Sequence, residues 1–561
     1  MSSSSASSFR LLEALKSSIL QIWPRVQDHG TFSIGAILGL VTLYAARYLA
    51  SPYRKLPPGP RGYPILGNLL EMGAGQWLKY AEWHKKYGDL IYLNAAGQPI
   101  AIINSQKVAV ALLDQRSAIY SDRPHNVVAG DIMTGGLLFA FSHYGDTWRR
   151  MRKAANEGFS KSSVKGFYET QITEAVLQAS DLLVGPAQWD SYFRRAAAST
   201  TLSVLYGYPT LKSEQDHIVV TINDFAERLF KAASIGSHLV HFLPWLRHLP
   251  SSLAKWKRDA EAWYKQDTAM FEGLFHMVEA NVAKGDDHQS AAATLIREVE
   301  KNKLSSIERA WFGGTVYTGG ADTTSAMMSW WMLAMLAYPE TQTRAHAELD
   351  AVVGRARLPT FTDYPHLPYI RAMVKEVLRW RPVGPLGVPH RSTEDDWYEG
   401  MFIPKGTICI PNIWHMNRDP EIFGKNTEHF DPGRYLGASG DLASGVSDIK
   451  VQGHFAYGFG RRICIGRHMA NNSLFINIAV ILWASKFDRK KDAAGQLLPL
   501  HLDGWVDVGL AVSADLVTYY YVDANVGIHF CRRPIPFELE ITARFPEAPG
   551  MLAQERELRG F

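Results

Sequence analysis

The stretch Tyr457–Gly466 limits what this chain can fold into more than any other feature. It reads YGFGRRICIG and places Cys464 in a glycine-rich, cationic loop just before an apolar run typical of a helix. A helix N-terminus and nearby guanidinium groups favour an anionic sulfur, so we expect this thiol to ionise more readily than a free one. Gly458, Gly460 and Gly466 allow sharp turns and a close approach to a large flat group. An isolated cysteine would be interpreted as a buried structural residue, whereas this loop predicts a thiolate ligand.

Composition and cysteine count bound the class of protein. The 561 residues are 47% apolar and 20% charged, which is typical of a globular chain. The net charge of +4 comes without a dominant basic block, so nucleic-acid binding is not suggested. The cysteines Cys409, Cys464 and Cys531 are too few and too scattered for a disulfide framework, which suits a reducing compartment. Cys409 lies in a strand-like run and is expected in the core.

The N-terminal region predicts a membrane anchor. Residues 1–30 form a polar and amphipathic segment, and residues 31–50 read TFSIGAILGLVTLYAARYLA, with Arg47 as the single charge. About 20 apolar residues span a bilayer core, so we expect a single-pass transmembrane helix over residues 31–50. A cleaved signal peptide and a buried helix are the alternatives, but the run is long for a signal core and lacks a convincing cleavage site. Basic residues flank both sides, so charge favours a cytosolic C-terminal part only weakly.

A proline-rich hinge is expected over residues 51–64. Four prolines lie within Leu56–Pro64, and each proline removes an N–H and restricts the residue before it. We therefore expect a stiff, extended connector that orients the following domain, residues 65–561, against the membrane.

The body of the chain is predicted to be mostly α with a small β subdomain, an α+β fold. Apolar residues recur with the helical period in the stretches Trp77–Tyr87, Trp148–Phe159, Tyr168–Leu183, Leu253–Val282, Ile307–Tyr338, Thr341–Val353 and Ile370–Trp380. Short β-rich runs predict strands at Leu90–Asn94, Ile100–Ile103 and Thr407–Ile410. No repeat and no linker rich in glycine and serine divides this body, so we expect one domain.

The cysteine loop and the hinge together resemble the cytochrome P450 family. The loop matches the family's haem-binding loop at nearly every defining position and departs only at Tyr457, where phenylalanine is usual. The hinge resembles that of microsomal members, especially fungal ones. The resemblance implies the cytochrome P450 fold with an N-terminal membrane anchor. It also implies heme b, with its iron bound axially by the Cys464 thiolate, a ligand that favours O–O cleavage.

A glycine pair with an acid and an alcohol interrupts the apolar stretch from Trp311 to Tyr338. The sequence Gly319–Thr324 reads GGADTT, and each glycine weakens a helix by about 1 kcal/mol relative to alanine. This pattern predicts a groove that admits something close to the backbone, with a packing notch as the alternative reading of the residues alone. The resemblance implies the oxygen-binding groove of the family, in which Asp322 and Thr323 relay protons.

Cationic and N–H donors for the two haem propionates are the next candidates. A buried dianion requires such donors. The segment 148–152 resembles the W-x-x-x-R helix of the family, which implies Trp148 and Arg152 as propionate contacts. The resemblance also implies Arg462 and His390, with Arg391 as an alternative to His390. We expect the adjacent pair, Arg149 and Arg150, to form a solvated basic face that docks a reductase.

Three charged residues are expected to support the cysteine loop. Glu376 and Arg379 lie three residues apart on one helix face, which is weak evidence by itself because exposed pairs contribute only about 0–1 kcal/mol. The segment Phe430–Tyr435 resembles the family's segment that completes a buried Glu-Arg-Arg network, which implies Arg434 as the third member. Removing one partner is expected to be strongly destabilising.

The segment 513–531, SADLVTYYYVDANVGIHFC, departs from the family pattern. It separates Val512 from the expected last strand pair at Arg533–Phe537. We interpret it as an extra hairpin at the rim of the substrate pocket or an unremoved intron in the gene, with a slight preference for the intron. Apolar residues that the resemblance places around the substrate are Val127, Val128, Ile132, Leu137, Leu138, Val383, Leu386 and Val388.

The sequence as a whole predicts a haem-dependent monooxygenase that inserts one oxygen atom of O2 into an apolar small molecule. The resemblance implies electrons from NADPH through cytochrome P450 reductase, with cytochrome b5 as a second candidate donor, and a location in the endoplasmic reticulum membrane with the catalytic domain facing the cytosol. A fungal secondary-metabolite pathway with a terpenoid or another apolar substrate is our hypothesis. The alternatives are a redox-neutral haem-thiolate isomerase or dehydratase and an inactive haem-binding paralogue.

Overall fold

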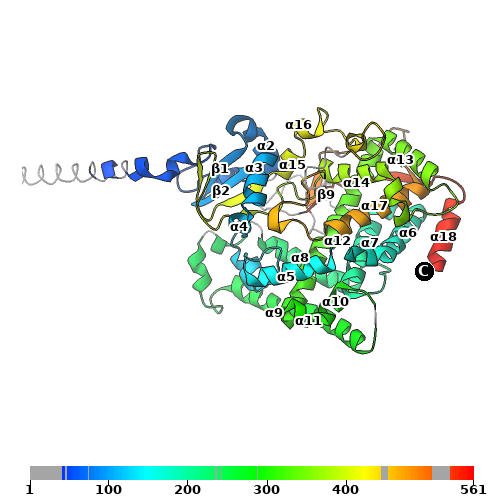
Figure 1. Cartoon of the computed structure of the whole chain (residues 1–561), viewed down its shortest axis with the longest axis horizontal. Helices are drawn as coiled ribbons and strands as arrows, with labels where there is room; N and C mark the ends of the chain where they lie inside the picture. The colour runs from blue at the N-terminus through cyan, green and yellow to red at the C-terminus, as the bar shows by residue number, and fades with distance from the viewer. Residues whose placement is uncertain are drawn as a thin grey trace, which may run out of the picture. The chain divides into compact units, whose positions relative to one another are not determined.

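The computed structural model describes residues 39, 41–43, 47–73, 75–233, 237–241, 243–286, 288–443, 453–507 and 531–561 (Figure 1). These residues form two compact units. The first consists of Met1–Pro57 with Asp395–Pro404, and the second of Pro58–Glu394 with Lys405–Phe561. The second unit contains every candidate site residue named above.

The first unit contains a small hairpin and a short 3-10 helix among its described residues. Strands β4 (Asp396–Tyr398) and β5 (Met401–Ile403) pair antiparallel, and η1 covers Pro52–Lys55. The ring of Tyr53 in η1 lies edge-on to that of Phe402, with centroids 5.4 Å apart. Most of the expected anchor, residues 31–50, lies outside the described residues. Within the described part of the chain, no helix combines the length and apolar character needed to cross a membrane.

The second unit is mainly helical, as the apolar periodicity predicts. All seven expected helices are present, and α7, α8, α10 and α18 were not expected. The α-helices are α2 (Gln76–Tyr87), α3 (Gln106–Ala109), α4 (Ser117–Tyr120), α5 (Asp146–Gly158), α6 (Tyr168–Val184), α7 (Trp189–Tyr206), α8 (His217–Ala233), α9 (Lys255–Ala283), α10 (Ala291–Arg297), α11 (Val299–Asn302), α12 (Ser306–Ala337), α13 (Pro339–Val352), α14 (Pro368–Trp380), α15 (Ile413–Met416), α16 (Pro420–Phe423), α17 (Arg467–Ala484) and α18 (Ala548–Leu558).

Short 3-10 and π turns connect these helices. They are η2 (Leu69–Glu71), η3 (Val110–Gln115), η4 (Val127–Met133), η5 (Ser163–Phe167), η6 (Pro186–Gln188), η7 (Leu239–His241), η8 (Pro244–His248), η9 (Phe361–His366), η10 (Pro432–Tyr435) and η12 (Gly460–Arg462). Of these, η3 and η4 have the π pattern, which occurs often at functional sites.

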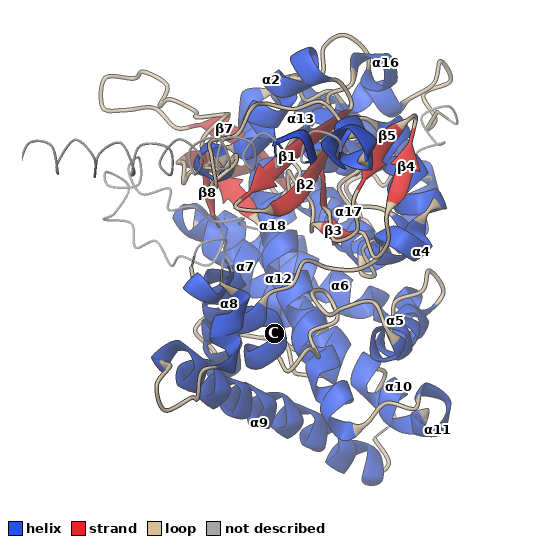
Figure 2. Cartoon of the chain, turned by 90° about the vertical axis from the view of Figure 1, so that its left-hand side faces the viewer, coloured by secondary structure: helices blue, strands red, loops and turns tan. Residues whose placement is uncertain are grey.

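The β-structure of this unit is small, as predicted. Strands β1 (Leu90–Ala95), β2 (Gln98–Ile103), β6 (Ile408–Pro411) and β3 (His390–Arg391) form one sheet in the order β1-β2-β6-β3, with only β2 and β6 parallel. Two further pairs are β7 (Ser485–Arg489) with β10 (Leu539–Ala543), and β8 (Trp505–Asp507) with β9 (Arg532–Pro534). Figure 2 shows β1, β2 and β3 gathered in the upper half of the view, with α2 and α16 above them and most of the helices below.

Helix α12 forms the centre of the helical part. A capping box between Ser305 and Glu308 starts it, and Pro339 begins the next helix directly after Tyr338. Its first half packs into one apolar cluster with α5, α7, α8 and α9, and its second half into another with α6, α14 and α17. Because α12 is covered on nearly all sides, its sequence is apolar all round rather than amphipathic.

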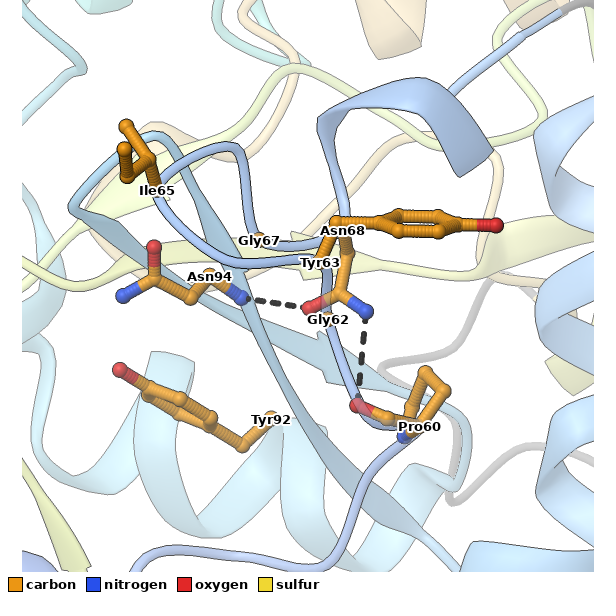
Figure 3. Close-up of a pocket in the computed structure, with 8 residues that line it drawn as sticks. All are labelled: Pro60, Gly62, Tyr63, Ile65, Gly67, Asn68, Tyr92 and Asn94. Carbon is orange, nitrogen blue, oxygen red and sulfur yellow. Dashed lines mark hydrogen bonds between the residues drawn. The ribbon is translucent and has the colours of Figure 1, made fainter.

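The C-terminal end of the hinge packs against β1. The N–H of Tyr92 donates to the carbonyl oxygen of Pro58 at 2.9 Å, and the N–H of Asn94 donates to Oδ1 of Asn68 at 3.0 Å. A Cβ on Gly67 would lie 2.0 Å from the carbonyl oxygen of Asn94, so this approach requires glycine. The cavity of about 350 Å³ in Figure 3 lies between these segments and includes Tyr63 in its lining.

The unusual segment 513–531 falls almost entirely outside the described residues. Its last member, Cys531, is buried and is followed directly by β9. The expected strand at Arg533–Phe537 is therefore present in part, paired with β8.

Candidate active site

The cysteine loop is a tight turn between η12 and the start of α17. Gly458 and Gly460 have φ values of 72° and 59°, in the left-handed region that favours glycine. A Cβ on Gly460 would lie 2.0 Å from the carbonyl oxygen of Leu113. The N–H of Cys464 donates to the carbonyl oxygen of Tyr457 at 2.8 Å and closes the turn. Gly466 has an ordinary φ of −80° and marks the first cap of α17.

Cys464 is accessible and yet strongly desolvated. Burial raises the pKa of its thiol, although N–H groups of Gly466 and Arg467 and the charge of Arg152 act to lower it. The prediction that the loop lowers this pKa is therefore wrong for the chain alone. The residue is nevertheless exposed by its accessible area. The two findings are compatible, because desolvation depends on all the protein atoms that surround the sulfur, whereas accessibility needs only one open side.

Tyr457 provides the one departure of the loop from the family pattern. Its hydroxyl donates to Oδ1 of Asn471 at 2.8 Å. Burial raises the pKa of this hydroxyl well above its usual value, and Cys464 adds to the effect. Because the hydroxyl has a partner, tyrosine is accommodated here without an unsatisfied buried group.

The predicted charged network beside the loop is present. Glu376 and Arg379 are fully buried, with Nε of Arg379 2.7 Å from Oε2 of Glu376, and Nε of Arg434 lies 3.0 Å from Oε1. Arg379 also donates to the carbonyl oxygen of Asn417 at 3.0 Å, and Oδ1 of Asn417 accepts the N–H of Phe455 at 2.9 Å. This chain of contacts connects the network to the start of the cysteine loop.

Three arginines gather next to the loop, of which Arg123 and Arg462 are buried and Arg152 is half-buried. Arg462 donates to the carbonyl oxygens of Ser121, Phe139 and Ser142, and Arg152 donates to that of Ile463. Burial lowers the pKa of Arg462 to about 9 and that of Arg152 to about 10. Arg123, which sequence reasoning missed, has its pKa lowered well below the usual value by burial and by the charges of Arg462 and Arg152. We call these three residues the arginine cluster.

The remaining predicted propionate contacts lie around this cluster. The guanidinium of Arg462 lies 4.3 Å from the centre of the buried Trp148 ring. Nδ1 of His390 donates to the carbonyl oxygen of Tyr120 at 2.8 Å, next to the segment that holds Arg123. The alternative, Arg391, lies 3.8 Å from Asp122.

The two arginines that follow Trp148 differ from each other. Arg149 is exposed and pairs with Asp146 on the same helix, as expected for a solvated face. Arg150 instead forms an ion pair of 2.5 Å with the buried carboxylate of Glu308 in α12. Arg150 therefore also serves as the counter-ion of a buried carboxylate, while its side chain stays 38% exposed. The docking role of this pair stays a prediction.

The acid and alcohol of α12 lie half-buried in an unbroken helix. Burial raises the pKa of Asp322, opposed by the charges of Arg533 and Arg194. The hydroxyl of Thr323 donates to the carbonyl oxygen of Gly319 at 2.7 Å. Gly319 is exposed, and a Cβ there would meet no atom within 4 Å, whereas a Cβ on Gly320 would lie 3.0 Å from Oγ1 of Thr201. The groove predicted from the glycine pair is therefore open at Gly319 alone.

Apolar residues from distant segments join beside this groove. The predicted substrate residues of the 127–138 segment share one apolar cluster with Tyr317 and Ala321 of α12 and with Ile465, the neighbour of Cys464. Val383 and Leu386 belong to two other clusters. The structure thus places the first group in the same cluster as Ile465, and Val383 and Leu386 in other clusters.

The residues present fit a haem group. The Cys464 sulfur is accessible, the N–H groups of Gly466 and Arg467 favour its anion, and the arginine cluster concentrates positive charge nearby. Asp122 counters that charge only in part, since it also accepts the N–H of Tyr144 at 2.9 Å. A dianionic group with one metal site opposite the sulfur would complete both features. The fold and the site therefore define a cysteine-ligated haem protein.

Comparison with known proteins agrees with this class. The family described as Cytochrome P450 matches residues 57–497. A cytochrome P450 monooxygenase of Armillaria gallica is 55% identical over 93% of this chain and 96% of its own length. Cytochrome P450 monooxygenase 58 of Postia placenta is 44% identical over 92% and 94%, and cytochrome P450 monooxygenase iboC of Amanita muscaria is 38% identical over 93% and 96%.

The chain belongs to the cytochrome P450 family and is an oxidoreductase of the monooxygenase type. Members of this family bind haem through a cysteine thiolate on the iron.

Proposed function

We propose that this chain inserts one oxygen atom of O2 into an apolar small molecule, with Cys464 as the axial haem ligand. When bound, the haem would supply the activation of O2 and the oxidation of the substrate. The observation that carries the proposal is the pairing of a desolvated, accessible cysteine with the arginine cluster. Trp148, Arg152, His390 and Arg462 would hold the propionates, and the position of Arg123 supports adding it to this set.

Asp322 and Thr323 would manage protons in the groove of α12. A carboxyl whose pKa is raised by burial can exchange a proton near neutral pH more readily than an ordinary aspartic acid. The Thr323 hydroxyl donates to Gly319, so its oxygen keeps lone pairs that can accept a hydrogen bond on the open side of the helix. The raised pKa of Asp322 and the open lone pairs of Thr323 support a proton-handling role for each residue.

The partners and location follow from the family. An NADPH-dependent reductase, with cytochrome b5 as a second donor, would supply electrons. We further propose a membrane anchor at residues 31–50, residence in the endoplasmic reticulum with the catalytic part in the cytosol, and a role in fungal secondary metabolism. The apolar cluster beside the groove supports an apolar substrate, of which a terpenoid is one candidate.

The first test uses the reduced, carbon-monoxide difference spectrum. We expect the chain to show the thiolate band and Cys464→Ser to lose it, because a neutral alcohol is a poor substitute for a thiolate. Cys409→Ser is the matched control, since Cys409 is buried in the sheet, pairs in register with Ala101 and His390, and has no proposed ligand role. A thiolate band that persists in the Cys464→Ser protein would overturn the assignment.

A second measurement separates monooxygenation from redox-neutral chemistry. We expect product formation to require NADPH and reductase, and Thr323→Ala to reduce product formed per NADPH consumed while the carbon-monoxide spectrum stays normal. Turnover without any electron donor would favour the isomerase or dehydratase alternative.

A further inference from the structure

A group of two histidines and two aspartates lies at one end of the η4 segment. One ligand atom each from His125, Asp131 and His143 can be chosen so that all three lie within 4.8 Å of one another. His125 directly precedes the segment Asn126–Met133, Asp131 lies within η4, and His143 lies in the loop before α5. Among the residues that the structure describes, this is the one group of its kind.

We propose that His125, Asp131 and His143 bind a divalent transition-metal ion such as Zn²⁺. Two imidazole nitrogens and one carboxylate oxygen form a donor set that zinc accepts, with water completing a tetrahedral shell. The proposal is independent of the proposed function, because none of these side chains is a candidate haem contact.

Asp122 holds His143 in the way expected of a residue in the outer shell of a metal site. Nδ1 of His143 donates to Oδ1 of Asp122 at 3.0 Å, which leaves Nε2 as the ligand nitrogen. That nitrogen lies 2.9 Å from Nδ1 of His125. A carboxylate that holds the remote nitrogen of a ligating histidine fixes both its tautomer and its ring orientation.

Asp131 presents an acceptor that the protein leaves unused. Its Oδ2 is buried and accepts no hydrogen bond within the described residues. The nearest cationic or imidazole groups are Nε2 of His125 at 3.4 Å and Nη2 of Arg247 at 3.9 Å. A metal ion between His125 and Asp131 would satisfy this oxygen directly.

The guanidinium of Arg247 lies beside two of the proposed ligands, where it would compete with a metal ion for them. Its Nη1 lies 3.3 Å from Nε2 of His125, so it contacts two of the three ligands. The side chain is 44% exposed and can swing into solvent. Arg247 is therefore expected to compete with the metal, and its removal should strengthen metal binding.

Metal binding would tie η4, through His125 and Asp131, to the loop before α5. The same segment contributes Val127, Val128 and Met133 to the apolar cluster beside the α12 groove. A bound ion would thus reduce the motion of one wall of the proposed substrate region.

The test measures Zn²⁺ binding to the haem-loaded full chain in detergent, by competition with a chromophoric chelator after prior metal removal. We expect one zinc ion per chain. His143→Ala and Asp131→Asn should each weaken it more than about 100-fold, and Asp122→Asn by about 10–100-fold, the range typical of an outer-shell partner. Arg247→Ala should tighten it. His276→Ala is the matched control, because His276 is an exposed histidine 4.0 Å from Glu279 and lacks a third ligand.

X-ray absorption at the zinc edge identifies the ligands without reference to activity. Two imidazoles and no sulfur support the proposal, whereas a sulfur ligand would indicate a cysteine site and overturn it. Absence of stoichiometric zinc, retention of affinity in both His143→Ala and Asp131→Asn, or weaker binding in Arg247→Ala would also overturn it. The carbon-monoxide spectrum of each variant shows whether it has folded.

Discussion

Two groups of arginines contact segments at or next to the cysteine loop and differ in how their charge is neutralised. Arg379 and Arg434 share the carboxylate of Glu376 and donate their remaining N–H groups to backbone carbonyls such as that of Asn417. The members of the arginine cluster, Arg123, Arg152 and Arg462, also donate to backbone carbonyls. Their pKa values, however, are lowered by burial and by the charges of neighbouring arginines.

The difference shows which part of the site the chain completes by itself. In the Glu376 network the pKa of Arg379 is raised: burial lowers it, and the adjacent carboxylate outweighs burial. No such excess of negative charge surrounds Arg462. The first group is therefore a finished structural support, whereas the second is a receptor whose counter-charge has to come from a bound anion.

The largest effect on stability is expected from a substitution in the Glu376 network. Glu376→Gln leaves two buried guanidinium groups without their carboxylate and should reduce the free energy of unfolding by about 3–5 kcal/mol. Urea unfolding followed by circular dichroism measures it. The control is Glu340→Gln, a 61% exposed glutamate near His429, which should change stability by less than about 0.5 kcal/mol. Equal effects of the two substitutions would show that the network is not a structural support.

A substitution in the arginine cluster should weaken haem retention more than it reduces folding stability. Arg152→Gln removes one half-buried cation, so we expect haem binding to weaken by about 2 kcal/mol, the lower end of the cost typical of truncating a buried charge pair. Transfer of haem to an excess of a haem-scavenging apoprotein measures the loss. Lys153→Gln makes the same charge change at the next, exposed position of α5. Similar transfer rates for the two variants would contradict a propionate role for Arg152.

This contrast also marks what could be predicted from the sequence. The helical period identified α12 and α14 because apolar residues dominate their buried faces, and the loop motif identified Cys464 and its neighbours. Helix α7 escaped because it is buried on most sides with polar residues inward, as when Arg195 pairs with Glu174 at 2.9 Å. Its pattern is therefore neither amphipathic nor uniformly apolar.

The arginine cluster shows a second limit. The burial of Arg123 depends on its hydrogen bonds to the carbonyl oxygens of Ala140, Val388 and Pro389, from segments up to 266 residues away. No local spacing around Arg123 could indicate these contacts. The raised pKa of Cys464 has the same origin, because the loop supplies the charges that lower it while the whole fold supplies the burial that raises it.

Substituting one member of a half-buried ion pair should reduce stability less than Glu376→Gln does and more than a substitution at the exposed surface does. The Arg357 guanidinium and the N–H of Thr360 overcome burial and hold the pKa of Asp363 below its usual value, with Oδ1 of Asp363 2.6 Å from Nη2 of Arg357. Because Arg357 is 49% exposed, solvent screens the pair, and Asp363→Asn should cost about 1 kcal/mol, including the lost cap of η9.

The pH dependence of this cost has a definite sign. The pKa of Asp363 is lower in the folded than in the unfolded chain, so its stabilisation is complete above about pH 3.9 and is lost as the pH falls through the folded pKa. The difference in unfolding free energy between the wild type and Asp363→Asn should therefore be constant from pH 7 to pH 5 and shrink at pH 3.5. A difference that grows on acidification would contradict this assignment.

The smallest effect on folding is expected at the surface of α5. Arg149 is 53% exposed and pairs with Asp146, which is 83% exposed, so screening leaves little stabilisation to lose and Arg149→Gln should unfold like the wild type. If this face docks the reductase, the same substitution should raise the reductase concentration needed for half-maximal reduction, and added salt should diminish the difference, because a charge at the rim of an interface acts mainly on association. Lys165→Gln, at an exposed position outside α5, is the control. Stopped-flow reduction at two ionic strengths is the measurement, since equal salt dependence in both variants would remove Arg149 from the docking face.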